Sequence, residues 1–181
     1  MAGLCRVEPQ EESIWHSTAM KQVWVIGQMD GGDVRLRNGA GSGLMDLDVS
    51  APVRSGQLSL SSAHISLDLT VALDKMKTGN FLTEHAARAF IAGYRAHDLV
   101  YAGKGGRGGD ATIVRGPAKA GNVDVEIELS VAPVDEDWDS MSEIEIVGSA
   151  EFGTVNIPIP GIGSVNDLVV EIDARLMVTA Q

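Results

Sequence analysis

Apolar and polar residues alternate with a period of two along much of this chain, which is the pattern of β-strands that bury one face. The most regular stretch runs from Val123 to Val131, where aliphatic residues alternate with Asp124, Glu126, Glu128 and Ser130. The segments 65–71 and 168–176 repeat the pattern. Each such strand is expected to turn one face to a dry interior and the other to water.

One segment changes to helical spacing. Its apolar positions, Leu82, Ala86, Ala89 and Phe90, recur at i, i+4, i+7 and i+8, with Asn80 as the expected N-cap. This pattern predicts one short helix near residues 80–92, inserted between strands and laid across an end of the sheet.

Shorter alternating or apolar stretches predict further strands at 23–26, 34–37, 44–49, 58–60, 97–102, 111–114 and 144–146. Pro52 is expected to interrupt the chain between two of them. The glycine-rich segment 103–109 predicts a flexible hairpin loop. The sequence Arg115-Gly116-Pro117 is expected to end the strand that begins at residue 111.

About eight or nine one-sided strands with short connections predict an all-β protein, either an antiparallel barrel or a two-sheet sandwich. We favour the barrel because closure removes exposed sheet edges. A barrel of eight strands is about wide enough to hold one elongated ligand. No internal repeat or linker is evident, so we expect a flexible N-terminal arm at residues 1–14 and a single domain at 15–181.

Composition bears on what such a barrel could hold. Apolar residues make up 44% of the chain but aromatic residues only 4%, so the interior is chiefly aliphatic and could line a cavity or fill a core. The expected inward, ligand-facing residues are Ile65, Leu67, Leu69, Val125, Ile127, Leu129, Val170 and Ile172, with Leu82 and Phe90 closing the mouth.

The formal net charge of −11 argues against nucleic-acid binding and against general adhesion to anionic membranes. Cys5 is the single cysteine, so no disulfide can form within the chain. No signal-peptide pattern and no apolar run of transmembrane length occurs, so we expect no membrane span and a cytoplasmic location, or a periplasmic one if the sequence has been trimmed.

An acidic loop is the strongest metal candidate. Asp135, Asp137 and Asp139 match the first three ligand positions of an EF-hand loop. Ser140 replaces the required glycine and Ile146 replaces the bidentate glutamate, so we favour a solvated loop and expect no metal or cofactor.

Catalytic chemistry has little support. None of the four histidines has a metal-binding spacing, and no nucleophile elbow or P-loop is present. The remaining enzymatic alternative is a small enzyme that uses His85 or His97 with a nearby carboxylate.

The order of these elements resembles the YceI-like family, over most of residues 15–178. The residues that carry the resemblance are Trp15-His16-Ser17, Asp74, Thr78-Gly79, Leu82, the turn Ile113 to Gly116, Lys119, Glu151-Phe152-Gly153 and Asn166-Asp167.

The resemblance implies a lipocalin-like antiparallel barrel of a bacterial lipid- or isoprenoid-binding protein, gated near the helix. We therefore expect non-enzymatic binding of a long apolar molecule of isoprenoid or fatty-acyl type. The alternative is a structural or protein-interaction β-domain with a packed core and no small ligand. Formation of a homodimer stays open.

Overall fold

A computed structural model describes residues 22–27, 33–38, 48–79, 81–135, 137–152, 155–157, 163–165 and 168–181. The predicted arm at 1–14 lies outside these ranges. The strands are β1 (Gln22–Gly27), β2 (Asp33–Asn38), β3 (Asp48–Leu60), β4 (His64–Ala72), β5 (Lys77–Thr78), β6 (Asp98–Gly106), β7 (Thr112–Ala120), β8 (Val123–Pro133), β9 (Glu143–Phe152), β10 (Val155–Ile157), β11 (Gly163–Val165) and β12 (Leu168–Ala180). A 3-10 helix, η1 (Leu73–Lys75), and an α-helix, α1 (Phe81–Tyr94), lie between β4 and β6.

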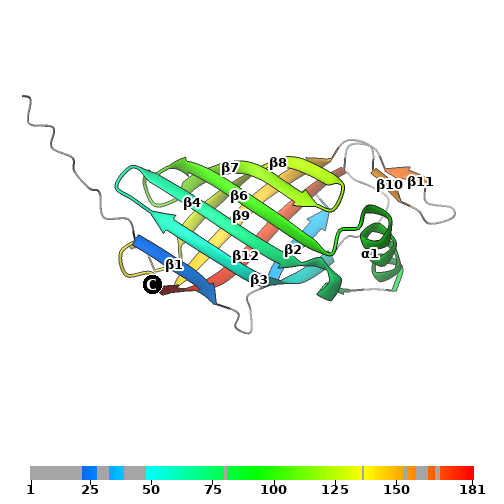
Figure 1. The fold of residues 1–181 in the computed structure, drawn as a ribbon, viewed down its shortest axis with the longest axis horizontal. Coiled ribbons are helices and arrows are strands. Elements are labelled where there is room, and N and C mark those ends of the chain that lie inside the picture. The colour runs from blue at the N-terminus through cyan, green and yellow to red at the C-terminus, as the bar shows by residue number, and fades with distance from the viewer. Residues whose placement is uncertain are drawn as a thin grey trace, which may run out of the picture.

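The long strands close into an antiparallel barrel with eight strand positions (Figure 1). β1 and β2 run in the same direction and share one position, because both pair with β12 on one side and with β3 on the other. The remaining positions follow as β3, β4, β6, β7, β8, β9 and β12. Pairing of β12 with β9, from Leu168 opposite Phe152 to Met177 opposite Glu143, closes the ring. The predicted all-β, eight-stranded barrel is confirmed.

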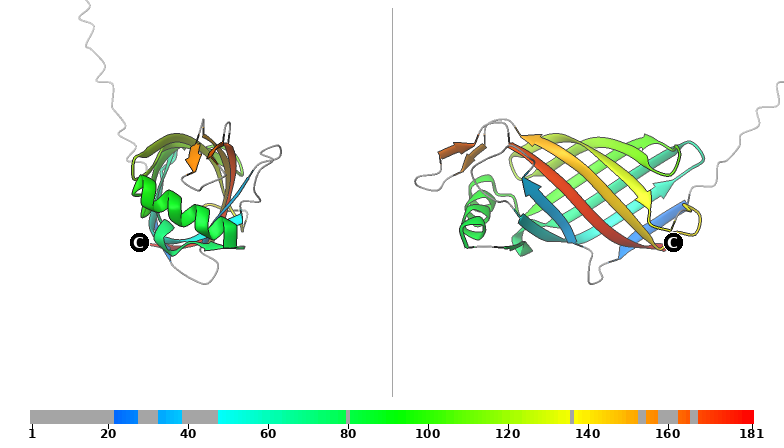
Figure 2. Two further views of the ribbon diagram at one scale, coloured as in Figure 1. Left: turned by 90° about the vertical axis from the view of Figure 1, so that its right-hand side faces the viewer. Right: turned by 180° about the vertical axis from the view of Figure 1, so that it is seen from behind.

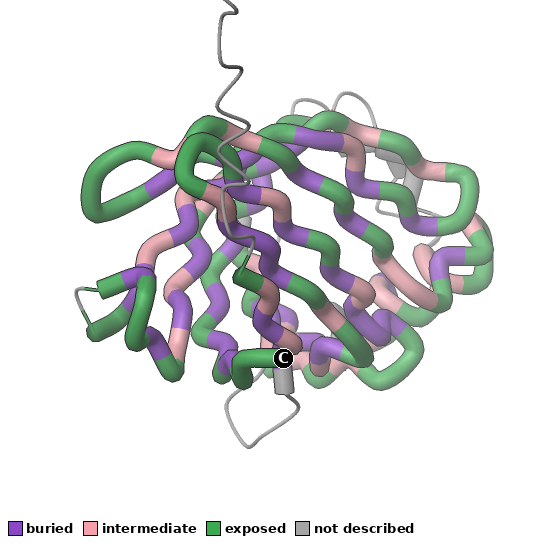
Figure 3. The backbone as a smooth tube through the Cα atoms, turned by 60° about the vertical axis from the view of Figure 1, so that its left-hand side comes forward, coloured by how far each residue is buried: buried purple, intermediate pink, exposed green. Residues whose placement is uncertain are grey.

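Burial follows the period-two pattern of the sequence (Figure 3). On β4 the side chains of Ile65, Leu67, Leu69 and Val71 are buried, while Asp68 between them is exposed. The same alternation runs along β12 from Val170 to Val178. The aliphatic faces of the strands therefore form the core of the barrel.

The predicted helix is present as α1, Phe81–Tyr94, and it lies across one opening of the barrel (Figure 2, left). Its expected N-cap, Asn80, lies outside the described residues. We call this opening the helix end; η1, β5 and the β7–β8 turn are also there. The opposite opening, the loop end, carries the β3–β4 turn and the 134–142 loop (Figure 1).

Two expected chain breaks are wrong. β6 continues to Gly106, so the loop expected from residue 103 begins later. β7 continues through Gly116 and Pro117 to Ala120, so this strand does not end at residues 115–117 as expected. The physical reason is close strand approach: a Cβ on Gly116 would lie 2.8 Å from the carbonyl carbon of Ala102. Glycine here lets two strands approach closely, which the sequence pattern alone does not distinguish from a turn.

Pro52 does not interrupt the chain either, because β3 runs without a break from Asp48 to Leu60. Pro52 pairs with Asp33 of β2, whereas pairing with β4 begins only at Val53. A residue without an N–H is tolerated where one side of the strand lacks a ladder partner.

Candidate ligand cavity

The interior of the barrel differs between its two halves. Towards the loop end it is filled by side chains, and Trp138 and Met141 of the 134–142 loop pack against the same core. The most deeply buried large side chains of this half are Leu58, Leu60, Ile65, Leu67, Ile144 and Leu176. No ligand can enter this half without displacing them.

Towards the helix end the interior holds an apolar cavity of about 50 Å³. Its lining is aliphatic apart from one tyrosine and consists of Val34, Leu36, Ala51, Leu69, Val71, Leu73, Leu99, Tyr101, Ile127, Leu129, Ile146, Ile172 and Ala174. A site of this size and polarity offers a water molecule few hydrogen-bond partners, so it favours apolar groups. In this conformation it admits the end of an apolar tail, and a longer tail requires side chains or α1 to move.

The residues expected to face a ligand divide between these regions. Leu69, Ile127, Leu129 and Ile172 line the cavity. Ile65 and Leu67 are buried in the filled half instead.

The other expected residues lie nearer the helix end. Val170 is buried, and Val125 packs, partly buried, against the core. Phe90 packs against the core from α1, with its ring centroid 4.8 Å from that of Tyr94. The side chain of Leu82 lies outside what the structure describes. The structure thus brings four of the expected residues to one cavity.

Tyr101 is the lining residue whose importance the sequence did not reveal. Its hydroxyl donates a hydrogen bond to the carbonyl oxygen of Val114 at 3.2 Å, with that of Ile127 at 3.5 Å. Burial raises the pKa of Tyr101 to about 12, and the charges of Glu126 and Glu128 act in the same direction. The hydroxyl is therefore neutral and bonded to the wall. The sequence indicated only that Tyr101 lies on the same strand face as Leu99.

The segment that carries α1 is tied together where it leaves and rejoins the barrel. The N–H of Asp74 donates to the carbonyl oxygen of His97 at 3.0 Å. Arg54 of β3 forms ion pairs with Asp74 at 3.2 Å and with Asp98 at 3.0 Å. At the far end of α1, the N–H of Asn122 donates to the carbonyl oxygen of Tyr94 at 3.0 Å. These contacts hold α1 across the helix end of the barrel.

The three aspartates of the 134–142 loop, Asp135, Asp137 and Asp139, are engaged within the protein. Asp137 accepts a hydrogen bond from the N–H of Asp139, and Asp135 accepts one from Ser142. Asp139 also lies 3.7 Å from Arg107. Across the described ranges, no group of three or more His, Cys, Asp or Glu residues could hold a metal ion.

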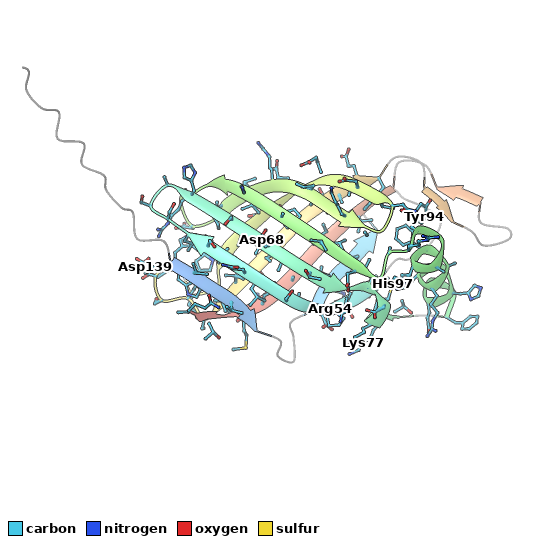
Figure 4. All side chains as sticks on the ribbon, in the orientation of Figure 1. Arg54, Asp68, Lys77, Tyr94, His97 and Asp139 are labelled. Atoms are coloured by element: carbon cyan, nitrogen blue, oxygen red, sulfur yellow. The ribbon has the colours of Figure 1, made fainter. Side chains whose placement is uncertain are left out.

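The histidines considered for catalysis are exposed. His85 stacks on Phe81 with ring centroids 6.2 Å apart, and neither His85 nor His97 lines the cavity. Figure 4 places His97 and Tyr94 at the helix end and Asp139 at the opposite end. The cavity lining contains no carboxylate, so no histidine and carboxylate converge there.

Comparison with known proteins gives a likeness in fold. No family model and no curated protein matches the sequence. The crystal structure of Burkholderia cenocepacia BcnA matches with a TM-score of 0.51 and 13% sequence identity, over 81% of this chain and 96% of that chain. The two proteins thus share a lipocalin-like barrel fold. Within the described ranges, no helix is both long and apolar enough to cross a bilayer.

Proposed function

We propose that this chain is a non-enzymatic binding protein that holds the apolar tail of an isoprenoid or fatty-acyl molecule inside its barrel. The observation that carries the proposal is the aliphatic cavity in the half of the barrel towards the helix end, because the buried side chains described in the other half leave the helix end as the favoured route of entry. The tail would enter first and point away from α1.

The binding energy in this proposal comes from transfer of the tail out of water. Each buried methylene contributes about 0.8 kcal/mol, so a tail of several carbons binds without a polar anchor. Tyr101 offers little specificity, because its hydroxyl already bonds to Val114. Selection would therefore depend on the length and width of the tail.

The proposed function agrees with what the YceI-like resemblance implies, and the likeness to BcnA supports the barrel on which that resemblance depends. Membership of that family, the identity of the lipid and a cytoplasmic location stay predictions.

A specific observation also favours the alternative of a structural domain without a small ligand. The filled loop-end half, with Leu58, Leu67, Ile144 and Leu176 buried, is the packing expected of such a domain. The two functions differ in whether the helix-end cavity takes up a ligand.

The test is native mass spectrometry of the purified protein, followed by titration with a fluorescent fatty acid. We expect co-purified apolar molecules and saturable binding of the probe. Ala51→Leu and Ala174→Leu fill the cavity and should weaken binding at least tenfold. Ala102→Leu adds the same atoms on the exposed face of β6 and should leave binding unchanged. Absence of bound lipid together with no saturable binding would support the structural alternative.

A further inference from the structure

The segment that covers the cavity differs in charge from the rest of the chain. Residues 75–97 contain four basic side chains, Lys75, Lys77, Arg88 and Arg95, against the single acidic Glu84, a net charge of +3 in a chain whose total is −11. His85 and His97 lie in the same segment. The acidic residues that flank it, Asp74 and Asp98, are both paired with Arg54.

These basic side chains are available to a partner. All four are exposed. Arg88 forms an ion pair with Glu84 at 2.6 Å, yet 76% of the Arg88 side chain stays exposed to solvent. Within the part of the chain that the structure describes, Lys75, Lys77 and Arg95 form no ion pair with an acidic side chain.

The same segment carries a large exposed aromatic side chain. Phe81, the first residue of α1, is 79% exposed, more than any other large apolar side chain among the described residues. Its only ring neighbour in those ranges is the exposed His85. An exposed aromatic ring in the same segment as several exposed basic side chains is a combination that favours the surface of an anionic bilayer.

We propose that the helix end is a docking surface for an anionic lipid bilayer, with Lys75, Lys77 and Arg95 facing the lipid headgroups and Phe81 entering the interface. This surface covers the mouth of the cavity, so docking would place the cavity next to the lipids. Transfer of an apolar tail between the bilayer and the cavity rests on the proposed function. Docking of the helix end to the bilayer does not depend on it.

The total charge of −11 opposes undirected adsorption but permits this orientation. The barrel is elongated, and α1 lies at one tip together with β10 and β11 (Figures 1 and 2). With that tip towards the membrane, the carboxylates towards the loop end lie on the side away from the lipids, and charges separated by more than the screening length of about 8 Å at physiological salt interact weakly. Among the described acidic residues near the tip, Asp48 is paired with Arg35 at 2.6 Å and Asp124 with Lys119 at 3.3 Å, whereas exposed Glu151 is an opposing charge.

The test is sedimentation of the full chain with vesicles of phosphatidylcholine alone or mixed with phosphatidylglycerol. We expect binding only to the anionic vesicles, weakened by added salt. Replacing Lys75, Lys77 and Arg95 together by Gln should lower affinity by roughly fivefold for each cation removed. Equal binding to both vesicle types, or no binding to the anionic ones, would overturn the proposal.

A matched control separates position from charge. Replacing Lys104, Arg115 and Arg175 by Gln changes the net charge by the same amount, but on the barrel wall. This control variant should lose much less vesicle affinity than the Lys75, Lys77 and Arg95 variant, because only the total charge of the protein has changed. If both triple variants lose affinity equally, the proposed surface is wrong. Circular dichroism checks that both variants are folded.

A spectroscopic readout reports the orientation. A Phe81→Trp variant should show a blue-shifted emission and quenching by brominated lipid on anionic vesicles, whereas Lys104→Trp should not. The same change in both, or in neither, contradicts the proposal.

Titration of the Lys75, Lys77 and Arg95 variant with the fluorescent fatty acid in solution distinguishes the two proposals. Unchanged probe binding with lost vesicle binding supports both. Vesicle binding by a wild-type protein that takes up no probe would leave docking standing and remove the proposed function.

Discussion

The ring of Tyr101 lies against Gly103 on the inner face of β6, so close that a Cβ on Gly103 would lie 2.7 Å from Cε1 of Tyr101. Both residues are buried. The absent side chain of Gly103 thus provides the space in which Tyr101 lies along the wall and its hydroxyl reaches Val114. A glycine that the sequence assigned to a loop is a packing partner of the cavity.

Gly103→Ala should therefore destabilise the barrel. The added methyl group forces the rigid Tyr101 ring to move and breaks its hydrogen bond, so we expect the free energy of unfolding to fall by about 1–3 kcal/mol in urea denaturation. Gly108→Ala is the control, since a Cβ there has no neighbour within 4 Å. An equal effect of the two substitutions would contradict the packing role of Gly103.

Tyr101 should make stability depend on pH in the alkaline range. The unfolded phenol titrates near 10.0, whereas the folded pKa is about 12. Between these pH values the unfolded chain releases a proton that the folded chain keeps, so stability falls as pH rises, by at most about 2–3 kcal/mol. Below pH 10 both states keep the proton and the effect is absent.

The measurement is urea denaturation of wild type and Tyr101→Phe from neutral pH to pH 12. The variant should be less stable by about 1 kcal/mol at neutral pH through loss of one buried hydrogen bond. Its stability should then fall less steeply with pH. Parallel curves for the two proteins would show that Tyr101 does not have the raised pKa.

Arg54→Gln should loosen the cover of the cavity more than it destabilises the fold. The ion pairs of Arg54 with Asp74 and Asp98 are about 40% exposed, so their loss costs about 1 kcal/mol or less. Because they join the two ends of the segment that carries α1, hydrogen exchange should accelerate in residues 73–98.

Arg175→Gln is the control for this prediction, because it breaks a similarly exposed pair with Glu145 at 3.2 Å on the barrel wall. Hydrogen exchange followed by mass spectrometry should show no local acceleration at 73–98 in this variant. Faster exchange there in both variants would mean that the Arg54 pairs have no specific role.

The proposed function implies that removal of the apolar ligand lowers thermal stability. A ligand present at about 100 times its dissociation constant stabilises the folded state by about 2.7 kcal/mol. Delipidated protein should therefore melt at a lower temperature in a calorimeter, and added fatty acid should restore the transition. The Ala174→Leu variant, with its cavity filled, should respond less, by about half or more; a full response in that variant would place the ligand elsewhere.

The sequence was most informative where one strand face is aliphatic throughout. On β4 the alternation from Ile65 to Val71 identified the inward side chains, because a strand places successive side chains on opposite faces. It was least informative at glycine and proline. Gly116 and Pro52 signal turns by local preference, yet contacts between strands far apart in sequence keep both inside strands.

By itself, the sequence determined which side chains of the alternating strands face inward, the presence of the inserted helix α1 and the aliphatic character of the interior, since all three follow from local periodicity. Only the tertiary structure decided that Leu67 is locked in a filled core while Leu69, two residues away on the same face, lines a cavity. The reason is that packing depends on what the opposite wall contributes. Closure of β9 against β12 sets those partners, and no local pattern records them.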